Sequence, residues 1–244
     1  MEDVKRAADL IKKAKYMVAL TGAGMSTESG IPDFRSNRGI YETMPEDALS
    51  REVLERNPRR FYREGYRILD NLAQKKPNPG HLALSRLQEE GYLKEIITQN
   101  IDNLHTKAGS KEVYEVHGET RRVRCTACAY QGDFQVMKDQ VEKGVIPPQC
   151  PECGRPLRPN VVMFGDPMPP AFEAALGAVE RADTMLIIGS SLQVMPVAYL
   201  PQYVDHLIII NQEPTPFDTR AEVVIHRGAG QTLEEILKAM GLYV

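Results

Sequence analysis

The sequence predicts an α/β fold in which a parallel sheet is flanked by helices. Short runs of Ile, Leu, Val and Met alternate along the 244-residue chain with segments of helical periodicity. Continuous apolar runs are typical of strands buried on both faces, which occur mainly in parallel sheets. A glycine-rich turn directly after the first run adds a second observation, because dinucleotide-binding sheets carry one there. Four cysteines in one interrupting segment predict a small additional module.

The elements of the sheet follow in order along the chain. An N-terminal helix is predicted by helical spacing of Val4, Ala7, Ala8, Ile11 and Ala14. Buried strands are predicted over 16–20, 95–98, 113–116, 184–188, 206–210 and 222–225. Helical patterns occupy 58–74, 80–90, 170–181 and 232–240. A Rossmann-like domain is therefore assigned to residues 1–35, 76–119 and 159–244, with a ligand expected at the carboxyl ends of its strands.

Two segments interrupt this alternation. Residues 36–75 are rich in Arg, Glu, Tyr and Phe and are predicted to form a helical insertion. Residues 120–158 contain all four cysteines between short polar stretches, and they are predicted to form a metal-binding module.

The cysteines form two CxxC pairs separated by 21 residues, Cys125 with Cys128 and Cys150 with Cys153. Two such pairs are typical of a zinc ribbon, in which four thiolates bind one ion tetrahedrally. Four thiolates leave no position for water or substrate, so the zinc ion is predicted to be structural. The alternatives are two disulfides or free thiols.

Composition narrows the class of protein. The formal net charge of −3 gives no general attraction to nucleic acid, so direct nucleic-acid binding is not expected. No apolar run approaches the ~18 residues that cross a bilayer, and the N-terminus lacks the features of a secretory signal. We therefore expect a cytoplasmic protein without membrane attachment, a compartment that also suits unpaired cysteine clusters.

The glycine-rich run over 22–35 carries the most information. Gly22 and Gly24 directly follow the first strand, where a dinucleotide pyrophosphate approaches the backbone of such sheets. Thr27 replaces the third glycine of the ordinary fingerprint, and the run ends in the tripeptide Asp-Phe-Arg. As a whole, the run resembles the cofactor loop of the sirtuins, the NAD-dependent protein deacylases, of a compact prokaryotic type.

Two further motifs follow predicted strands. Gln99-Asn100-Ile101-Asp102 comes after the strand at 95–98, and His117 comes after the strand at 113–116. A histidine there suits proton transfer, since its ordinary pKa of ~6.5 permits both forms near neutrality. For an isolated histidine, a structural role would be the better interpretation. Both motifs match sirtuin motifs, and the resemblance implies that His117, Asn100 and Asp102 are catalytic.

The resemblance also implies which residues bind NAD, the co-substrate of the family. Phe34 would shield the reacting carbon from water, and Arg35 would lie near the phosphates. Residues 189–191 would meet the phosphate and ribose, and 211–213 the adenosine ribose. The implied set is Gly22, Ala23, Gly24, Thr27, Phe34, Arg35, Gln99, Asn100, Ile101, Asp102, Gly189, Ser190, Ser191, Asn211, Gln212, Glu213 and Ala229.

Residues 161–166 resemble the sirtuin segment that binds acyl-lysine peptides as an added strand, a mode driven by main-chain hydrogen bonds. From the residues alone, an ordinary core strand over 161–164 is an equally good interpretation. The resemblance implies the substrate residues Val162, Phe164, Gly165, Asp166 and, on the opposite edge, Val194.

The acyl group can be partly predicted. Sirtuins that prefer acidic acyl groups carry a Tyr-x-x-Arg pair in the helical insertion. Tyr62 matches the tyrosine of that pair, but Gly65 stands where the arginine would be. A neutral acyl group, acetyl first, is therefore favoured.

The resemblance thus implies removal of acetyl groups from protein lysines, with release of nicotinamide and O-acetyl-ADP-ribose. A protein ADP-ribosyltransferase is the alternative within enzymes, and a sensor of NAD or ADP-ribose is another, although a sensor would be expected to lack His117 or Asp102. A zinc-ribbon nucleic-acid binder is disfavoured by the net charge. A dehydrogenase is disfavoured because no acidic residue is evident ~20 positions past the glycine loop.

Overall fold

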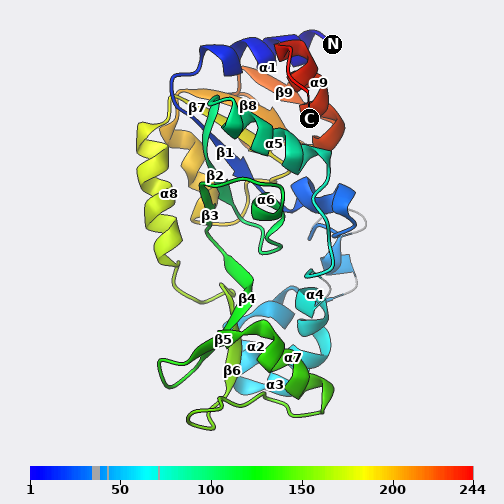
Figure 1. Ribbon diagram of the computed structural model, residues 1–244, viewed down its shortest axis with the longest axis vertical. Coiled ribbons are helices and arrows are strands. Elements are labelled where there is room, and N and C mark those ends of the chain that lie inside the picture. The colour runs from blue at the N-terminus through cyan, green and yellow to red at the C-terminus, as the bar shows by residue number, and fades with distance from the viewer. Residues whose placement is uncertain (35–38, 43, 71, 244) are drawn as a thin grey trace.

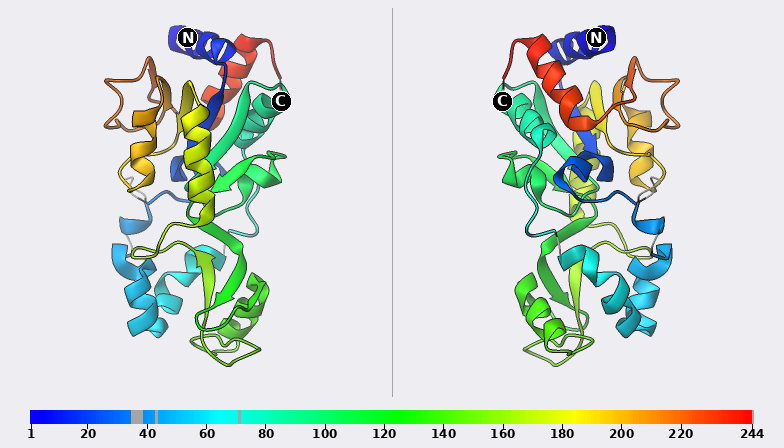
Figure 2. Two further views of the ribbon diagram at one scale, coloured as in Figure 1. Left: turned by 90° about the vertical axis from the view of Figure 1, so that its left-hand side faces the viewer. Right: turned by 90° about the vertical axis from the view of Figure 1, so that its right-hand side faces the viewer.

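A computed structural model describes residues 1–34, 39–42, 44–70 and 72–243, and it places them in two lobes (Figure 1). The larger lobe contains a six-stranded sheet covered by helices, and the smaller lobe contains a three-stranded sheet with short helices. Figure 2 shows the same two lobes from both sides, with the connecting segments between them. The predicted α/β fold with a small additional module is confirmed.

The large sheet is entirely parallel, and its strand order fixes where a ligand can bind. The order is β3-β2-β1-β7-β8-β9. The strands are β1 (Met17–Thr21), β2 (Leu93–Thr98), β3 (Val113–Glu115), β7 (Thr184–Ile188), β8 (His206–Ile210) and β9 (Val223–Ile225). The chain adds strands on one side of β1 first and on the other side from β7 onward. This reversal leaves a crevice at the carboxyl ends of β1 and β7, the usual ligand position in such sheets.

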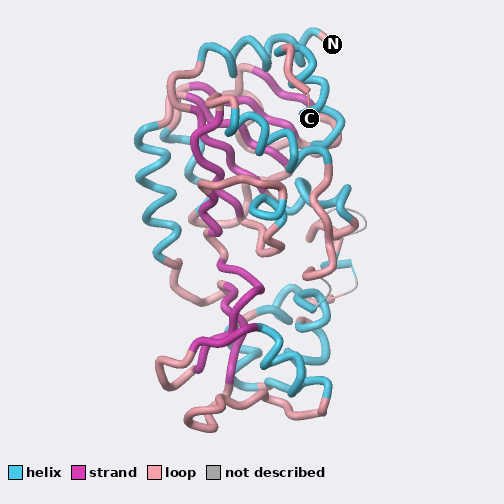
Figure 3. The backbone as a smooth tube through the Cα atoms, in the orientation of Figure 1, coloured by secondary structure: helices cyan, strands magenta, loops and turns pink. Residues whose placement is uncertain are grey.

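Helices cover both faces of this sheet (Figure 3). One face packs against α1 (Glu2–Lys13), α5 (Pro79–Glu89) and α9 (Ala229–Met240), and the other against α8 (Pro170–Arg181) and the 3₁₀ helix η4 (Val197–Tyr203). In β1, Met17 and Ala19 face the first layer, and Val18 and Leu20 face the second. Burial on both faces explains why the strands appear in the sequence as continuous apolar runs.

Local signals in the sequence set the helix ends. The Asn78 side chain accepts hydrogen bonds from the amides of Gly80 and His81, and the His81 ring accepts one from the Asn78 amide, which fixes the start of α5. Acidic residues in the first turn of α1 and lysines in its last turn match the helix dipole. None of the helices among the described residues has the length and apolarity needed to cross a membrane.

The smaller lobe combines two segments that are separate in the sequence. Its antiparallel sheet has the order β5-β4-β6 and contains β4 (Gly118–Cys125), β5 (Gln131–Asp133) and β6 (Leu157–Val161). The helix α7 (Phe134–Glu142) lies between β5 and β6 in the sequence. The insertion contributes η2 (Ile40–Glu42), η3 (Glu46–Leu49), α2 (Arg51–Arg56), α3 (Pro58–Glu64) and α4 (Tyr66–Asp70). Phe61 and Tyr62 of α3 share one hydrophobic cluster with Val123, Met137 and Leu157. The helical insertion and the cysteine segment therefore have a common core.

The structure differs from the sequence prediction in two places within this lobe. The single helix predicted over 58–74 is wrong, because the described residues form α3 and α4, which are divided at Gly65. A side chain there would place its Cβ 2.6 Å from Leu49 Cδ2, so η3 packs directly against this glycine. The three strands of the small sheet were not predicted, since β4 carries three arginines that interrupt any apolar run.

Gly189, directly after β7, offers a test of this fold. Its φ is +59°, and a Cβ would lie 2.2 Å from the Met25 amide nitrogen. Gly189→Ala should therefore add an overpacking cost of about 1–3 kcal/mol to a left-handed backbone cost of about 1–2 kcal/mol, measured by urea unfolding. Gly91→Ala is the matched control, because Gly91 has φ +79° and open space around it. Equal losses in the two variants would contradict the close approach.

Candidate active site

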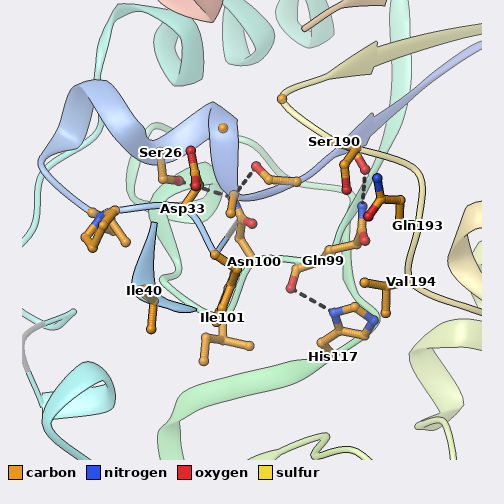
Figure 4. Close-up of a pocket in the computed structure, with 18 of the residues that line it drawn as sticks. Ser26, Asp33, Ile40, Gln99, Asn100, Ile101, His117, Ser190, Gln193 and Val194 are labelled. Atoms are coloured by element: carbon orange, nitrogen blue, oxygen red, sulfur yellow. Dashed lines mark hydrogen bonds between the residues drawn. The ribbon is translucent and has the colours of Figure 1, made fainter. Parts of the chain in front are cut away.

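A cavity of about 960 Å³ lies at the carboxyl ends of the central strands, between the two lobes. Its wall is formed by the segment after β1, the end of β2, residues 161–166, residues 189–196 and residues 210–214. Figure 4 shows part of this wall, with Ser26 and Asp33 on one side and His117 and Val194 on the other. All predicted cofactor and substrate residues that the structure describes line this cavity. Arg35 lies outside the described residues.

Two glycine turns meet at the floor of the cavity. The Gly22 amide donates to the Ile188 carbonyl over 3.0 Å, and the Gly24 amide donates to the Gly189 carbonyl over 2.9 Å. A Cβ on Gly22 would lie 2.7 Å from the Gly189 oxygen, and a Cβ on Gly24 would lie 2.8 Å from the Gly189 Cα. Glycine is therefore needed at these positions because the two backbones are in contact, whether or not a ligand also approaches them.

Ser26 connects two of the predicted catalytic residues. It lies in the 3₁₀ helix η1 (Ala23–Ser29), and its hydroxyl donates to Asp102 Oδ2 over 2.6 Å. The same hydroxyl accepts a hydrogen bond from Asn100 Nδ2 over 3.1 Å. Burial raises the pKa of Asp102, while the hydrogen bonds from Ser26 and the Leu104 amide oppose this rise. The carboxyl group is thus held by neutral donors at the edge of the cavity.

Two buried histidines support this arrangement from behind. The His81 ring lies 3.4 Å from the Ser26 hydroxyl, and His105 lies 2.9 Å from the Thr21 hydroxyl, with the two rings 4.8 Å apart. Burial lowers the pKa of His81 to about 4 and that of His105 well below its ordinary value. Both rings are therefore neutral at pH 7. Because His81 Nδ1 accepts from the Asn78 amide, its proton is on Nε2, directed at Ser26.

Ser26, His81 and His105 are site residues that were not predicted from the sequence. Ser26 lies within the glycine-rich run over 22–35, and that position could have identified it as a site residue. His81 follows a helix-capping asparagine, and His105 lies beyond the end of β2. Nothing in their sequence positions shows that they converge on one buried cluster.

His117 lies between β3 and β4, where the chain passes from the large lobe to the small one. Its Nδ1 is 3.1 Å from the Gln99 carbonyl oxygen, which can only accept a hydrogen bond. In the neutral ring the proton is therefore on Nδ1, and Nε2 keeps a free lone pair. Burial lowers the pKa of His117, and the Gln99 carbonyl partly opposes this. The imidazole is consequently present as a base near neutral pH.

The other end of the cavity is fixed by contacts between loops. The Gln99 side chain donates to the Ser190 hydroxyl over 2.8 Å. Glu28 of η1 accepts a hydrogen bond from the Gly230 amide over 2.9 Å, at the start of α9. A Cβ on Gly230 would lie 2.2 Å from the Glu28 carboxylate. These contacts place the segment around Ala229 beside the glycine-rich run.

The predicted substrate edge lies at the mouth of the cavity. Phe164 and, on the opposite edge, Met195 are half exposed, at 51% and 54%. Val162 and Val194 line the cavity between them. The Asp166 carboxylate, in contrast, is buried and paired with Arg158 instead of facing the opening. The Asp166 backbone forms part of the wall, while its carboxylate forms a buried ion pair with Arg158.

Tyr62, which matches the tyrosine of the Tyr-x-x-Arg pair, does not line the cavity. Its hydroxyl donates to the Leu157 carbonyl over 3.1 Å within the core of the small lobe. Other side chains of the insertion line the cavity instead, among them the apolar Ile68, Leu69 and Leu72 and the acidic Glu42 and Glu46. The prediction that Tyr62 corresponds to an acyl-binding tyrosine is therefore wrong, because its side chain lies outside the cavity.

The four cysteines converge on one metal site. The sulfurs of Cys125, Cys128, Cys150 and Cys153 all lie within 4.8 Å of one another, and those of Cys125 and Cys153 are 3.5 Å apart and those of Cys128 and Cys150 3.7 Å apart. Zinc–thiolate bonds of ~2.3 Å in a tetrahedron place sulfurs ~3.8 Å apart, whereas a disulfide needs about 2.05 Å. The donor set thus fits one zinc ion. None of the four lines the cavity, which agrees with a structural role.

A Rossmann-type sheet, a cavity at its switch point and a four-thiolate site define a nucleotide-binding α/β protein with a structural zinc module. A family model described as the Sir2 family matches residues 22–196. The chain belongs to this family, the sirtuins, as the sequence resemblance predicted.

Relatives match over nearly the whole chain. NAD-dependent protein deacetylase 2 of Caldanaerobacter subterraneus subsp. tengcongensis is 52% identical over 234 residues, which cover 95% of this chain and 94% of that protein. An NAD-dependent protein deacylase of Thermococcus kodakarensis is 40% identical, with coverages of 95% and 93%. A solved Sir2 structure with a p53 peptide and NAD+ is 34% identical, covers 98% of both chains and has a TM-score of 0.91.

Replacement of Ser26 tests the buried cluster. Ser26→Ala removes the donor to Asp102 and the acceptor for Asn100, and each polar group left buried without a partner costs about 1–3 kcal/mol. We expect a loss of stability of that order in urea unfolding. Ser29→Ala is the matched control, because the Ser29 hydroxyl is buried in the same 3₁₀ helix without a hydrogen-bond partner. Similar stabilities of the two variants would contradict the cluster.

Removal of zinc tests the metal site. Apparent binding free energies of four-thiolate sites are ~10–16 kcal/mol, comparable to the stability of a whole domain. We expect a chelator to release one zinc per chain and to abolish amide protection in β4, β5 and β6, measured by hydrogen exchange. Protection in β1 and β7 should persist. Full protection of the small sheet in metal-free protein would contradict a structural role.

Proposed function

We propose that this chain is an NAD-dependent protein-lysine deacetylase, which transfers the acetyl group of a modified lysine to ADP-ribose and releases nicotinamide and O-acetyl-ADP-ribose. The observation that carries the proposal is the position of His117. This neutral base lines one cavity together with the glycine turns at one end and the substrate edge at the other. The names of the relatives, which are NAD-dependent protein deacetylases and deacylases, support the same function.

The binding of NAD is assigned to the cavity residues named from the sequence. Gly22, Gly24 and Gly189 would admit the diphosphate, because their backbones are bare of side chains at the cavity floor. Asn100 and Asp102, held by Ser26, would contact the ribose and nicotinamide side. Bound NAD supplies an ADP-ribosyl group that accepts the acetyl oxygen as nicotinamide leaves. The presence of NAD+ in a related Sir2 structure supports this assignment.

His117 and Asp102 would act on the reacting groups in different ways. The free Nε2 of His117 would remove a proton from a ribose hydroxyl, and its Nδ1–H remains fixed by the Gln99 carbonyl. The Asp102 carboxyl group would stabilise positive charge that develops on the sugar. Phe34, which lines the cavity, would keep water from the reacting carbon.

The substrate in this proposal is a protein or peptide that carries acetyl-lysine. The peptide would lie as an added strand between residues 161–166 and the edge at Val194, with the acyl chain directed inward. A neutral acyl group is favoured, because the described insertion residues that line the cavity include the apolar Ile68, Leu69 and Leu72 and the acidic Glu42 and Glu46 but no basic residue that would pair with an acidic acyl group. Related Sir2 structures contain acetylated and propionylated peptides.

Two further assignments belong to this proposal. We assign residues 1–35, 76–119 and 159–244 to the NAD-binding domain, 36–75 to the helical insertion and 120–158 to the zinc-binding module, whose sheet extends slightly past these bounds because β4 begins at Gly118 and β6 ends at Val161. A cytoplasmic location is supported by four cysteines arranged for a metal ion instead of disulfides, as expected in a reducing compartment.

The reaction is tested by its product. Incubation of the zinc-loaded protein with NAD and an acetyl-lysine peptide should yield free nicotinamide, deacetylated peptide and O-acetyl-ADP-ribose, identified by mass spectrometry. An ADP-ribosylated peptide that keeps its acetyl group would instead show a protein ADP-ribosyltransferase. Binding of NAD without turnover would show a sensor.

Replacement of His117 tests the base. His117→Ala should lower turnover by ~10²–10⁴-fold, because general-base catalysis contributes that much, while zinc content and unfolding midpoint stay near those of the wild type. Near-normal turnover would remove His117 from the mechanism.

The pH profile gives an independent test of the same residue. The folded-state pKa of His117 is lowered, so the neutral base persists below pH 6.5 and is lost as the pH falls through the lowered pKa. The acidic limb of kcat/KM should therefore lie below 6.5. His206→Gln, a change at an exposed histidine paired with Glu222, should leave this limb unchanged. An acidic limb above 6.5 would contradict the buried base.

A further inference from the structure

The substrate edge ends in a tight turn. The Asp166 amide donates to the Met163 carbonyl over 2.9 Å, and Gly165 has φ +91°. A positive φ at the third residue is the mark of a type II turn, which requires glycine there. The turn leaves Phe164 projecting at the mouth of the cavity, 51% exposed. The position of Phe164 and the backbone beside it therefore depends on what holds this turn.

A buried carboxylate holds the turn from inside. The Asp166 side chain is 3% exposed, and its Oδ2 accepts a hydrogen bond from the Met163 amide over 3.0 Å. Both carboxylate oxygens also accept from the Arg158 guanidinium, Oδ1 over 3.0 Å. Despite burial, Arg158 and the Met163 amide keep the pKa of Asp166 below its ordinary value. Asp166 thus remains charged and fully engaged within the protein.

Arg158 reaches both ends of the substrate edge. Its side chain, 8% exposed, extends from β6, and besides Asp166 it donates to the Val161 carbonyl over 3.1 Å. Val161 begins the edge and Asp166 ends it, so one guanidinium spans the segment. The next residue, Val162, donates its amide to the His117 carbonyl over 2.8 Å. The edge is therefore fixed to the small lobe by a side chain and to the base by its backbone.

Stability alone does not account for such a pair. Burial of two charges costs about as much solvation as their attraction returns, and apolar residues often replace buried ion pairs without loss. The bidentate fork of arginine, in contrast, fixes geometry in a way that an apolar contact does not. Here the fixed element is the strand edge that a peptide would join. A role in shaping that edge follows from the position of the pair.

We infer that Arg158 and Asp166 are positioning residues for substrate binding: their buried ion pair connects β6 to residues 161–166 and holds that segment in the shape that pairs with an acyl-lysine peptide. The inference rests on the proposed function. In this inference the Asp166 carboxylate does not contact the substrate. It acts by holding the turn together with Arg158.

The test separates peptide binding from NAD binding. Asp166→Asn keeps the size of the side chain and removes its charge, and Arg158→Gln combined with Asp166→Asn leaves no unpaired buried charge if the single variant folds poorly. The dissociation constant of a fluorescein-labelled acetyl-lysine peptide would be measured by anisotropy, and the KM of NAD by turnover. Asp47→Asn, which breaks an exposed pair with Arg60 beside the same edge, is the matched control.

We expect peptide affinity to fall at least tenfold in the single and double variants, with zinc content and the KM of NAD within twofold of the wild type. Hydrogen exchange should quicken at the amides of residues 162–166. Unchanged peptide affinity in a folded, zinc-loaded variant would overturn the inference, as would an equal loss for NAD and peptide. A wild-type protein that binds the peptide without NAD-dependent turnover would overturn the proposed function alone. The role of the ion pair would still be tested by comparing the peptide affinities of the variants and the wild type.

Discussion

The structure depends on contact between two bare backbone turns where the strand order reverses. Gly22 and Gly24 after β1 meet Gly189 after β7, and their amides and carbonyls bond across the crevice. This contact sets the direction in which η1 leaves the sheet, and η1 in turn brings Ser26 to the end of β2. The second glycine of the dinucleotide fingerprint is usually explained by the approach of the ligand. In this chain the protein itself already requires the absence of side chains.

The two chain segments that connect the lobes carry the base and the substrate edge of the cavity. His117 lies on the segment that leaves the large sheet, and the substrate edge lies on the segment that returns to it. The His117 carbonyl bonds the Val162 amide, so the base and the edge are fixed relative to each other. At the other side of the cavity, neutral buried histidines hold Ser26 and Thr21. These buried polar contacts hold Asn100 and Asp102 in place, as a pre-organised site requires.

Sequence analysis predicted the large sheet because burial on both faces leaves a plain pattern of apolar runs, as in residues 184–188 and 206–210. It also predicted the four-cysteine site, since metal ligation fixes residue type and spacing. The small sheet was not predicted, because arginines interrupt the apolar pattern of β4 and because the sheet packs against a distant segment, the helical insertion. Ser26 and the buried histidines escaped for a related reason: their meeting depends on how distant elements pack, and no local spacing encodes it. Tyr62 shows the reverse error, where a motif match did not reveal which way the side chain points.

The mixed core of the small lobe has a consequence for synthesis on the ribosome. Phe61 and Tyr62 emerge well before Val123, Met137 and Leu157, with which they share their cluster. Until the cysteine segment follows and captures its metal, these aromatic rings have no apolar partner from that segment. Nascent chains with exposed apolar surface are prone to aggregate, and chaperones bind such surface. The supply of zinc during translation should therefore influence how much of this protein reaches its native state.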